Sequence, residues 1–126
     1  MAGFLGRYQI RRGRPLAELP EGNRQDARKH TRHVLRPEAE AVEAFLADPG
    51  TFEAFRRRYE ATVARRFAED RAPFDALAAL AREAPVYLGC SCPTKRQAHP
   101  ERCHTALALH FMGERYPGLD VRDELA

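Results

Sequence analysis

All three cysteines and three of the five histidines fall within residues 87–111, YLGCSCPTKRQAHPERCHTALALHF. A deprotonated cysteine can act as a nucleophile or a metal ligand, and a histidine can transfer protons or bind metal near neutral pH. Arginine and lysine in the same segment could hold an anion, because a guanidinium binds phosphate through two parallel hydrogen bonds. Four interpretations are therefore open: an anion site, a metal site, a reactive thiol, or ordinary packing of small apolar cysteines.

The position of this segment favours an anion site. Residues 85–90 (PVYLGC) are typical of a short buried strand, and the next helix is expected to start near Cys103. Ligands of α/β sheets gather at the carboxyl ends of strands, where helix N-termini offer free N–H groups. The alternative is an ordinary capped helix start next to a solvent-exposed loop, with no ligand. We expect a small anion, phosphate or nucleotide-like, held by Cys90, Cys92, Lys95, Arg96, Arg102 and Thr105.

Cys103 is the candidate nucleophile, because a helix N-terminus and a neighbouring histidine or arginine lower the pKa of a thiol. His104 would then be the general acid or base, so that Cys103 and His104 are the catalytic pair if the protein is an enzyme, which the sequence leaves open. Cys90 and Arg96 also match the C-x5-R spacing of thiol phosphatases. That loop contains Pro93 and no glycine, however, and such a match arises easily by chance in an arginine-rich chain.

Zinc is an alternative ligand. Cys90, Cys92 and Cys103, with His99 or His104, would supply four soft ligands. The spacing lacks the two C-x-x-C-like pairs of common zinc sites, and adjacent residues on one helix diverge by about 100°. We therefore assign no metal ligands and leave the cofactor open.

Nucleic acid is a further possible partner, because the chain has a net charge of +3 and a pI of about 9.0. Basic side chains cluster at residues 24–36, 56–58 and 65–66, and phosphate contacts need only accessible cations. Most of the eleven Phe and Tyr residues fall on predicted buried faces, so a base-stacking surface is not favoured. No apolar run reaches membrane-spanning length, and an odd number of cysteines suits a reducing cytoplasm.

The surrounding elements predict a single domain over residues 1–126. We expect a strand at 4–10, an irregular loop at 11–24, a helix at 25–35, and a helix whose first residue is Pro37. A long helix follows Thr51, with an apolar stripe (Phe52, Phe55, Tyr59, Val63, Phe67) and i, i+4 pairs (Glu53–Arg57, Arg56–Glu60, Arg65–Glu69). A helix from Pro73, the 85–90 strand, a last helix and an edge strand near 119–125 complete the chain. The fold class is α/β, helix-rich, with a small parallel Rossmann-like sheet flanked by helices.

Three stretches, TFEAFRRRYEATVARRF, LAALAREAPVYLGCSC and CHTALALHF, resemble the domain-of-unknown-function family 488 (DUF488). The resemblance runs from about Phe52 to Met112. A second family, DUF4326, looks like a cousin through a C-C-P…CH arrangement, which Cys90, Cys92, Pro93, Cys103 and His104 match. The D-R-W-P-R-G-like stretch typical of DUF488 is replaced by RYQIRRGRP near the N-terminus. The resemblance implies a compact Rossmann-like fold and no particular chemistry.

Overall fold

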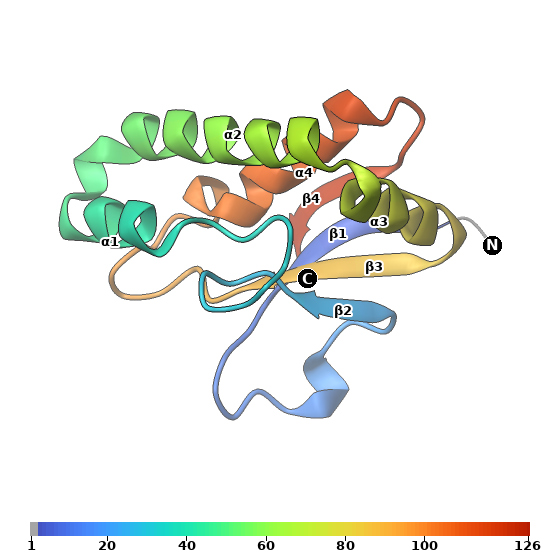
Figure 1. Ribbon diagram of the computed structural model, residues 1–126. Helices are drawn as coiled ribbons and strands as arrows, with labels where there is room; N and C mark the ends of the chain where they lie inside the picture. The colour runs from blue at the N-terminus through green and yellow to red at the C-terminus, as the bar shows by residue number, and fades with distance from the viewer. Residues whose placement is uncertain (1–2) are drawn as a thin grey trace.

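The computed structural model describes residues 3–126, in which four parallel strands form one sheet (Figure 1). The strands are β1 (Phe4–Gln9), β2 (Asn23–Asp26), β3 (Pro85–Cys90) and β4 (Val121–Leu125), in the spatial order β2-β3-β1-β4. Strand β1 pairs with β3 in parallel over its whole length. The predicted strands near the N-terminus, at 85–90 and at the C-terminus are confirmed, and so is the small parallel sheet.

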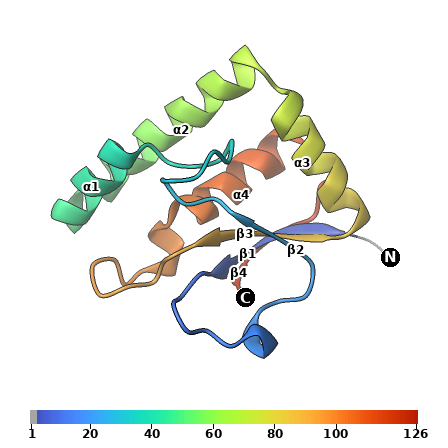
Figure 2. The same ribbon diagram turned by 60° about the horizontal axis from the view of Figure 1, so that its bottom comes forward.

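Four α-helices of the described chain cover one face of the sheet (Figure 2). The segment between β1 and β2, which contains a one-turn 3-10 helix at Leu16–Glu18, runs along the opposite side. A helix-rich α/β fold is therefore confirmed. The helices are α1 (Ala39–Ala47), α2 (Phe52–Glu69), α3 (Ala72–Glu83) and α4 (His104–Arg115).

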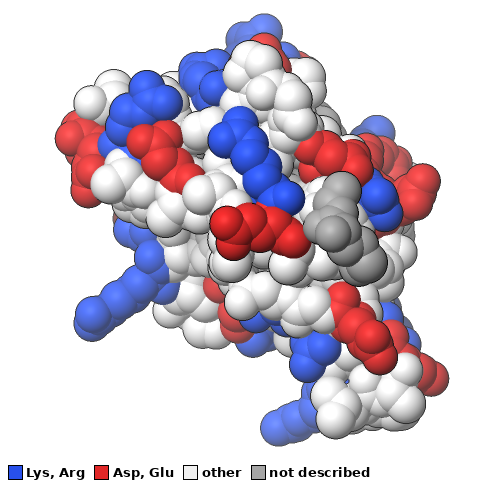
Figure 3. All heavy atoms as spheres, turned by 90° about the vertical axis from the view of Figure 1, so that its right-hand side faces the viewer, with Lys and Arg blue, Asp and Glu red and all other residues white. Residues whose placement is uncertain are grey.

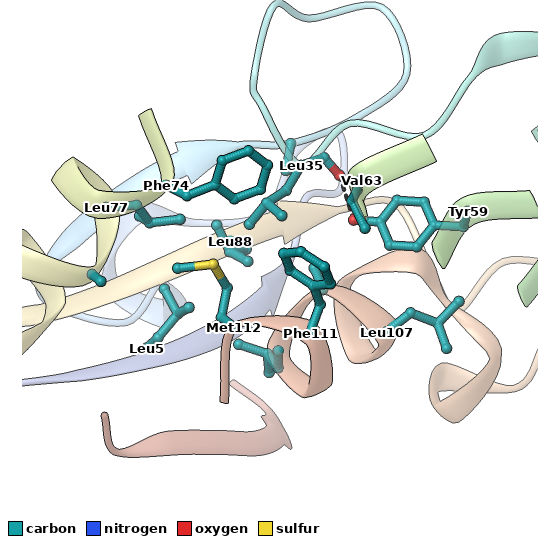
Figure 4. Packing of buried hydrophobic residues seen from close by; sticks show 14 of the residues in the cluster. Leu5, Leu35, Tyr59, Val63, Phe74, Leu77, Leu88, Leu107, Phe111 and Met112 are labelled. Atoms are coloured by element: carbon teal, nitrogen blue, oxygen red, sulfur yellow. Dashed lines mark hydrogen bonds between the residues drawn. The ribbon is translucent and has the colours of Figure 1, made fainter. Parts of the chain in front are cut away.

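The core lies between the sheet and the helices, where apolar side chains from both layers meet (Figure 4). Leu5 and Leu88 project from the sheet, and Phe74 of α3 and Met112 of α4 pack above them, each fully buried. The apolar stripe predicted for α2 faces this core: Phe55, Tyr59 and Val63 are buried, and Phe52 and Phe67 pack at its margin. Burial of each such side chain contributes roughly 1.5–3 kcal/mol, so this stripe fixes α2 on the sheet.

The helix predicted for residues 25–35 does not form. Strand β2 ends at Asp26, and residues 27–38 form an irregular segment, here named the 27–38 loop. The Asp26 carboxylate accepts a hydrogen bond from the Arg28 amide (3.0 Å), and the Thr31 hydroxyl donates to the Arg28 carbonyl (2.7 Å). Such local bonds from side chain to backbone compete with helical ones.

Contacts from α2 then fix the loop: the buried Tyr59 hydroxyl donates to the Leu35 carbonyl (2.6 Å), and Arg66 donates to the Val34 and Arg36 carbonyls. Helix α1 accordingly begins at Ala39, two residues after the predicted Pro37. In the 11–24 segment, Asn23 and Arg24 already belong to β2. The backbone groups of the loop are thus bonded to tertiary partners that no local sequence pattern reveals.

The i, i+4 ion pairs predicted on α2 are confirmed for all three pairs of residues. Their closest nitrogen–oxygen distances are 4.0 Å for Glu53–Arg57, 2.9 Å for Arg56–Glu60 and 3.9 Å for Arg65–Glu69. Within residues 3–126, no helix is both long enough and apolar enough to cross a bilayer.

Candidate functional site

A cavity of about 460 Å³ opens at the carboxyl ends of β2 and β3. Its wall is formed by the 27–38 loop, by α1, by residues 91–97 after β3, and by the start of α4. This is where parallel α/β sheets bind ligands, because the chain diverges from the strand ends to leave a crevice. The segment that the sequence singled out therefore lines a real cavity, which we call the strand-end pocket.

All three thiols and one imidazole line the strand-end pocket. Cys103 Sγ lies 3.7 Å from His104 Nδ1, and the Thr105 hydroxyl lies 3.5 Å from the same sulfur. That hydroxyl is also 3.2 Å from Cys90 Sγ, so it connects two of the thiols. Cys92 follows on the pocket wall and is half-buried. Thr105 itself is fully buried behind the sulfur atoms and does not line the pocket.

Cys103 and His104 point toward each other, although adjacent helical residues would diverge. Cys103 is the N-cap of α4, with extended backbone angles (φ −92°, ψ 151°), and His104 is the first helical residue. The helical spacing therefore does not apply to this pair, and the divergence expected from the sequence is wrong. The change of backbone at the N-cap is what brings thiol and imidazole together.

The protonation pattern of His104 follows from its other ring nitrogen. His104 Nε2 lies 2.7 Å from the carbonyl oxygen of Ala27, which can only accept a hydrogen bond. Nε2 must therefore carry the hydrogen, and Nδ1 of the neutral ring presents a lone pair to Cys103. This is the arrangement in which an imidazole takes the proton of a thiol.

The three thiols differ in their acidity. The neighbouring thiols of Cys90 and Cys92, followed by the His104 ring, hold the pKa of Cys103 well below its usual value, against the effect of burial. The pKa of Cys90 is raised by its contact with Cys103, and that of Cys92 is raised to about 11 for the same reason. Cys103 is therefore the thiol that ionises first, and it does so at the positive end of the α4 dipole.

Cationic side chains surround the mouth of the pocket. Lys95, Arg96 and Arg102 line it as the sequence analysis expected, and Arg102 also lies over the Phe52 ring at 5.8 Å. Lys29 and Arg28 of the 27–38 loop join them. These last two were not expected here, because a helix over residues 25–35 gave no reason to bring them to the ends of β2 and β3.

One carboxylate connects cations from two sides of the pocket mouth. Glu43 of α1 forms ion pairs with Lys29 and with Arg96, the second at 3.6 Å. Lys29 and then Arg96 lower the pKa of Glu43, so it is charged at neutral pH. Lys95, in contrast, forms no ion pair with any residue that the structure describes. Glu43 carries one negative charge against Lys29 and Arg96, and Arg28 is paired with Asp26 (2.8 Å), so the five cations of the mouth keep a positive balance.

The remaining wall is apolar. Phe45 and Phe55 are buried and stacked, with ring centroids 5.1 Å apart, and both face the pocket with Val42, Leu46 and Pro37. The sequence placed Phe55 on the apolar stripe of α2 and did not reveal that it also borders a cavity. The apolar pattern of α1 predicts a buried face but does not reveal that part of this face borders a cavity.

Two polar side chains at the end of β1 hold the backbone on which the site is built. Arg7, only 4% exposed, donates to the Pro100 carbonyl just before α4 (2.7 Å) and to the Asp123 carbonyl of β4 (2.8 Å). The Gln9 amide donates to the Pro93 carbonyl (2.8 Å). Arg7 thus fixes the start of α4, and Gln9 fixes the segment after β3.

The remaining candidate metal ligand, His99, does not lie with the three cysteines. His99 is exposed and lies 3.3 Å from the Glu101 carboxylate, outside the pocket. Among residues 3–126, no cluster of three or more His, Cys, Asp or Glu side chains has an arrangement suited to a metal ion.

A family model described as the active DUF488-N3 subclade (DUF488-N3a) matches residues 12–115. The chain belongs to the DUF488 family. The match covers every residue that lines the strand-end pocket, and it reaches far beyond the Phe52–Met112 span of the sequence resemblance toward the N-terminus. No curated protein and no solved structure matches this DUF488 chain.

Strands β1 and β4 lie outside the residues matched to the DUF488-N3 subclade. They include Arg7 and Gln9, which hold the backbone of the pocket from below. In this DUF488 protein the matched residues therefore line the pocket, and residues outside the match help to position them.

Proposed function

We propose that this DUF488 protein binds a small anionic molecule, phosphate-bearing or nucleotide-like, in the strand-end pocket and that Cys103 attacks it as a nucleophile. The observation that carries the proposal is the placement of the Cys103–His104 pair on the floor of a cavity whose mouth is lined by cations. A thiolate, a proton acceptor and a charged rim in one cavity are the parts that covalent catalysis on an anionic substrate needs.

Two features support an anionic group on the ligand. No side chain caps the N-terminus of helix α4, and its N-cap Cys103 and first residue His104 line the pocket, so an anion bound there would lie near the positive end of the helix dipole. Lys95 and Arg102 are available beside it, and their charge-assisted hydrogen bonds to a phosphate would each contribute about 1.5–3 kcal/mol.

The apolar wall supports a second, uncharged part of the ligand. Phe45 and Phe55 line the same cavity as the cations, and a pocket of about 460 Å³ is larger than a bare phosphate requires. A compound that joins a flat apolar group to an anion, such as a nucleotide, would use both walls.

In the proposed reaction His104 takes the thiol proton at Nδ1 while its Nε2 stays bonded to the Ala27 carbonyl. The Cys103 thiolate forms a bond to the electrophilic atom of the substrate, and the bond to the leaving group breaks. His104 then returns its proton to the leaving group. Lys95 and Arg102 would stabilise negative charge on the substrate throughout.

Calorimetric titration with inorganic phosphate and with adenosine monophosphate tests the binding half. We expect the nucleotide to bind more tightly than phosphate, and K95A/R102A to weaken both by at least about tenfold, given two lost charge-assisted bonds. Arg57→Ala, an exposed α2 residue outside the pocket, is the matched control and should change neither affinity. If neither phosphate nor adenosine monophosphate binds, the proposal is contradicted.

Alkylation by iodoacetamide tests the nucleophile. Because the pKa of Cys103 is lowered, Cys103 should be labelled faster than Cys90 and Cys92 at neutral pH, and its pH–rate profile should lie at lower pH than that of an ordinary thiol. In His104→Gln the thiol loses its proton acceptor, so its pKa should rise and the rate at neutral pH should fall, by about tenfold per unit once that pKa exceeds the working pH. His110→Gln, an exposed histidine on the same helix, should leave the profile unchanged. Slow, uniform labelling of all three cysteines in the wild type would be decisive against a Cys103 nucleophile.

A further inference from the structure

Two of the three pocket thiols form no bond to the substrate in the proposed reaction. Cys90 and Cys92 line the same cavity as Cys103, and all three are free thiols. The Thr105 hydroxyl contacts both Cys90 and Cys103, at 3.2 and 3.5 Å, so their sulfur atoms share one small space. A second thiol beside a reactive one is the arrangement of a cysteine that is oxidised and then resolved as a disulfide.

The two spare thiols differ in their freedom to move. Cys90 is the last residue of β3; it pairs with Gln9 of β1, its carbonyl accepts from the Ile10 amide (2.7 Å), and its side chain is 1% exposed. Cys92 lies two residues further on, outside the strand, and is half-buried on the pocket wall. Disulfide formation requires the two sulfur atoms to approach to about 2.05 Å. Gln9 holds the neighbouring Pro93 carbonyl, but Cys92 itself lies outside the β1–β3 ladder and can shift without breaking it, which Cys90 cannot.

We propose that a hydroperoxide entering the strand-end pocket oxidises Cys103 and that Cys92 resolves it as a reversible disulfide. The inference rests on the assignment of Cys103 as the reactive thiol in the proposed function. It adds an oxidisable pair and a resolving residue to that site.

The chemistry takes place in two steps. The Cys103 thiolate attacks the terminal oxygen of the hydroperoxide and the O–O bond breaks. The sulfur, oxidised by two electrons, becomes a sulfenic acid that keeps the hydrogen of that oxygen, and the alkoxide takes up a proton and leaves as an alcohol. The Cys92 sulfur then attacks the Cys103 sulfur, so that the S–S bond forms and the S–O bond breaks. The hydroxide that departs takes the Cys92 proton and leaves as water.

The disulfide would change what the pocket can do. It removes the nucleophile and ties the segment after β3 to the start of α4, across the floor where the anion is expected to bind. A small-molecule dithiol would restore the free Cys103. The site would therefore act in the reduced protein and stop in the oxidised one.

The test uses reduced full-length protein treated with stoichiometric hydrogen peroxide and then analysed by intact mass. We expect wild type to lose two hydrogens and to regain them with dithiothreitol. Trypsin leaves Cys90 and Cys92 on one peptide, because no lysine or arginine separates them, so variants must identify the partner. Cys92→Ser should form no disulfide and should give a dimedone adduct of the sulfenic acid at Cys103, whereas Cys90→Ser should still form the disulfide.

Each other result overturns the inference. A disulfide that persists in C92S, or disappears in C90S, would assign the resolving role to Cys90. Wild type that is labelled rapidly by iodoacetamide at Cys103 but is not oxidised would leave the proposed nucleophile intact and remove the disulfide. Failure of both labelling and oxidation would remove both proposals. Thermal unfolding curves of C90S and C92S that overlay the wild-type curve would establish that the variants are folded.

Discussion

At the scale of single residues, His33 couples the stability of the fold to pH. Its Nδ1 accepts from the Leu35 amide (3.1 Å) and its Nε2 bonds to the Gln25 side-chain oxygen (2.8 Å), so the neutral ring holds the 27–38 loop against β2. Burial, followed by the nearby His104, lowers the pKa of His33 to about 4. Protonation would remove the Nδ1 lone pair that the loop uses.

We predict that this histidine makes the protein less stable in mild acid. Because the folded-state pKa is below the unfolded value of about 6.5, the contribution is complete above about pH 6.5 and is lost as the pH falls toward 4. Since the ring is partly exposed, the loss is at most about 3 kcal/mol. Urea unfolding at several pH values measures it. His33→Gln should flatten this part of the profile, whereas His110→Gln should not; equal slopes in all three proteins would refute the coupling.

The contact between Cys103 and His104 could not be predicted from their adjacency in the sequence. Cys103 and His104 were expected to diverge, and they meet because one is an N-cap and the other is helical. A sequence pattern places a helix start within a residue or two, and the side-chain directions on either side of that boundary depend on which residue is the cap. The candidate residues could be named from the sequence, but their contact could not.

At the scale of elements, Glu43 of α1 joins two segments that approach the pocket from opposite sides. Its carboxylate is paired with Lys29 of the 27–38 loop and Arg96 of the segment after β3. An incoming anion must compete with this carboxylate for the same two cations. Glu43 should therefore restrain the binding of weak anions to the pocket mouth.

We predict that Glu43→Gln binds inorganic phosphate about two- to fivefold more tightly than wild type, the size of effect expected when an exposed ion pair is removed. Titration calorimetry at low salt measures the difference, and added salt should reduce it because exposed charges are screened. Glu40→Gln provides the matched control on the same helix, since Glu40 pairs with Arg58 of α2 instead. Identical phosphate affinities for wild type, E43Q and E40Q would show that the carboxylate does not compete.

The periodicity of apolar residues predicted the helices and strands that bury one face. It did not predict elements without a buried face. The stripe of α2 and the apolar run of β3 both carry their burial pattern in the sequence, and both formed as expected. Strand β2 reads NRQD and buries none of its four residues, so no apolar pattern marks it. The 27–38 loop is held by Tyr59 and Arg66 of α2, partners more than twenty residues away in the chain.

At the scale of the whole molecule, the parallel topology collects distant segments at one end of the sheet. Two stretches that are far apart in the sequence, the 27–38 loop with α1 and the segment after β3 with the start of α4, follow the carboxyl ends of β2 and β3 and line the same pocket. The position of a ligand site could therefore be predicted from the strand-to-helix order alone. Its composition could not, because Lys29, Glu43 and Phe45 reach it through tertiary packing.

The arginines on the surface of α2 differ from the cations of the strand-end pocket in how they are paired. The arginines of α2 are largely paired with acids: Arg56, Arg57 and Arg65 with glutamates of the same helix, and Arg58 with Glu38. On the face drawn in Figure 3, basic and acidic side chains are interspersed rather than gathered by sign. Within the described chain, neither the α2 arginines nor this face therefore forms a continuous basic patch.

We therefore predict that single-stranded oligonucleotides bind no tighter than about 10 μM at physiological salt, within the range of non-specific phosphate contacts. Fluorescence anisotropy over a salt series measures this affinity. Arg57→Gln with Arg65→Gln should weaken the binding seen at low salt, because both side chains are exposed, and should leave phosphate binding in the pocket unchanged. Submicromolar binding that survives physiological salt would contradict the prediction. It would show that the α2 arginines bind nucleic-acid phosphates despite their ion pairs with glutamates.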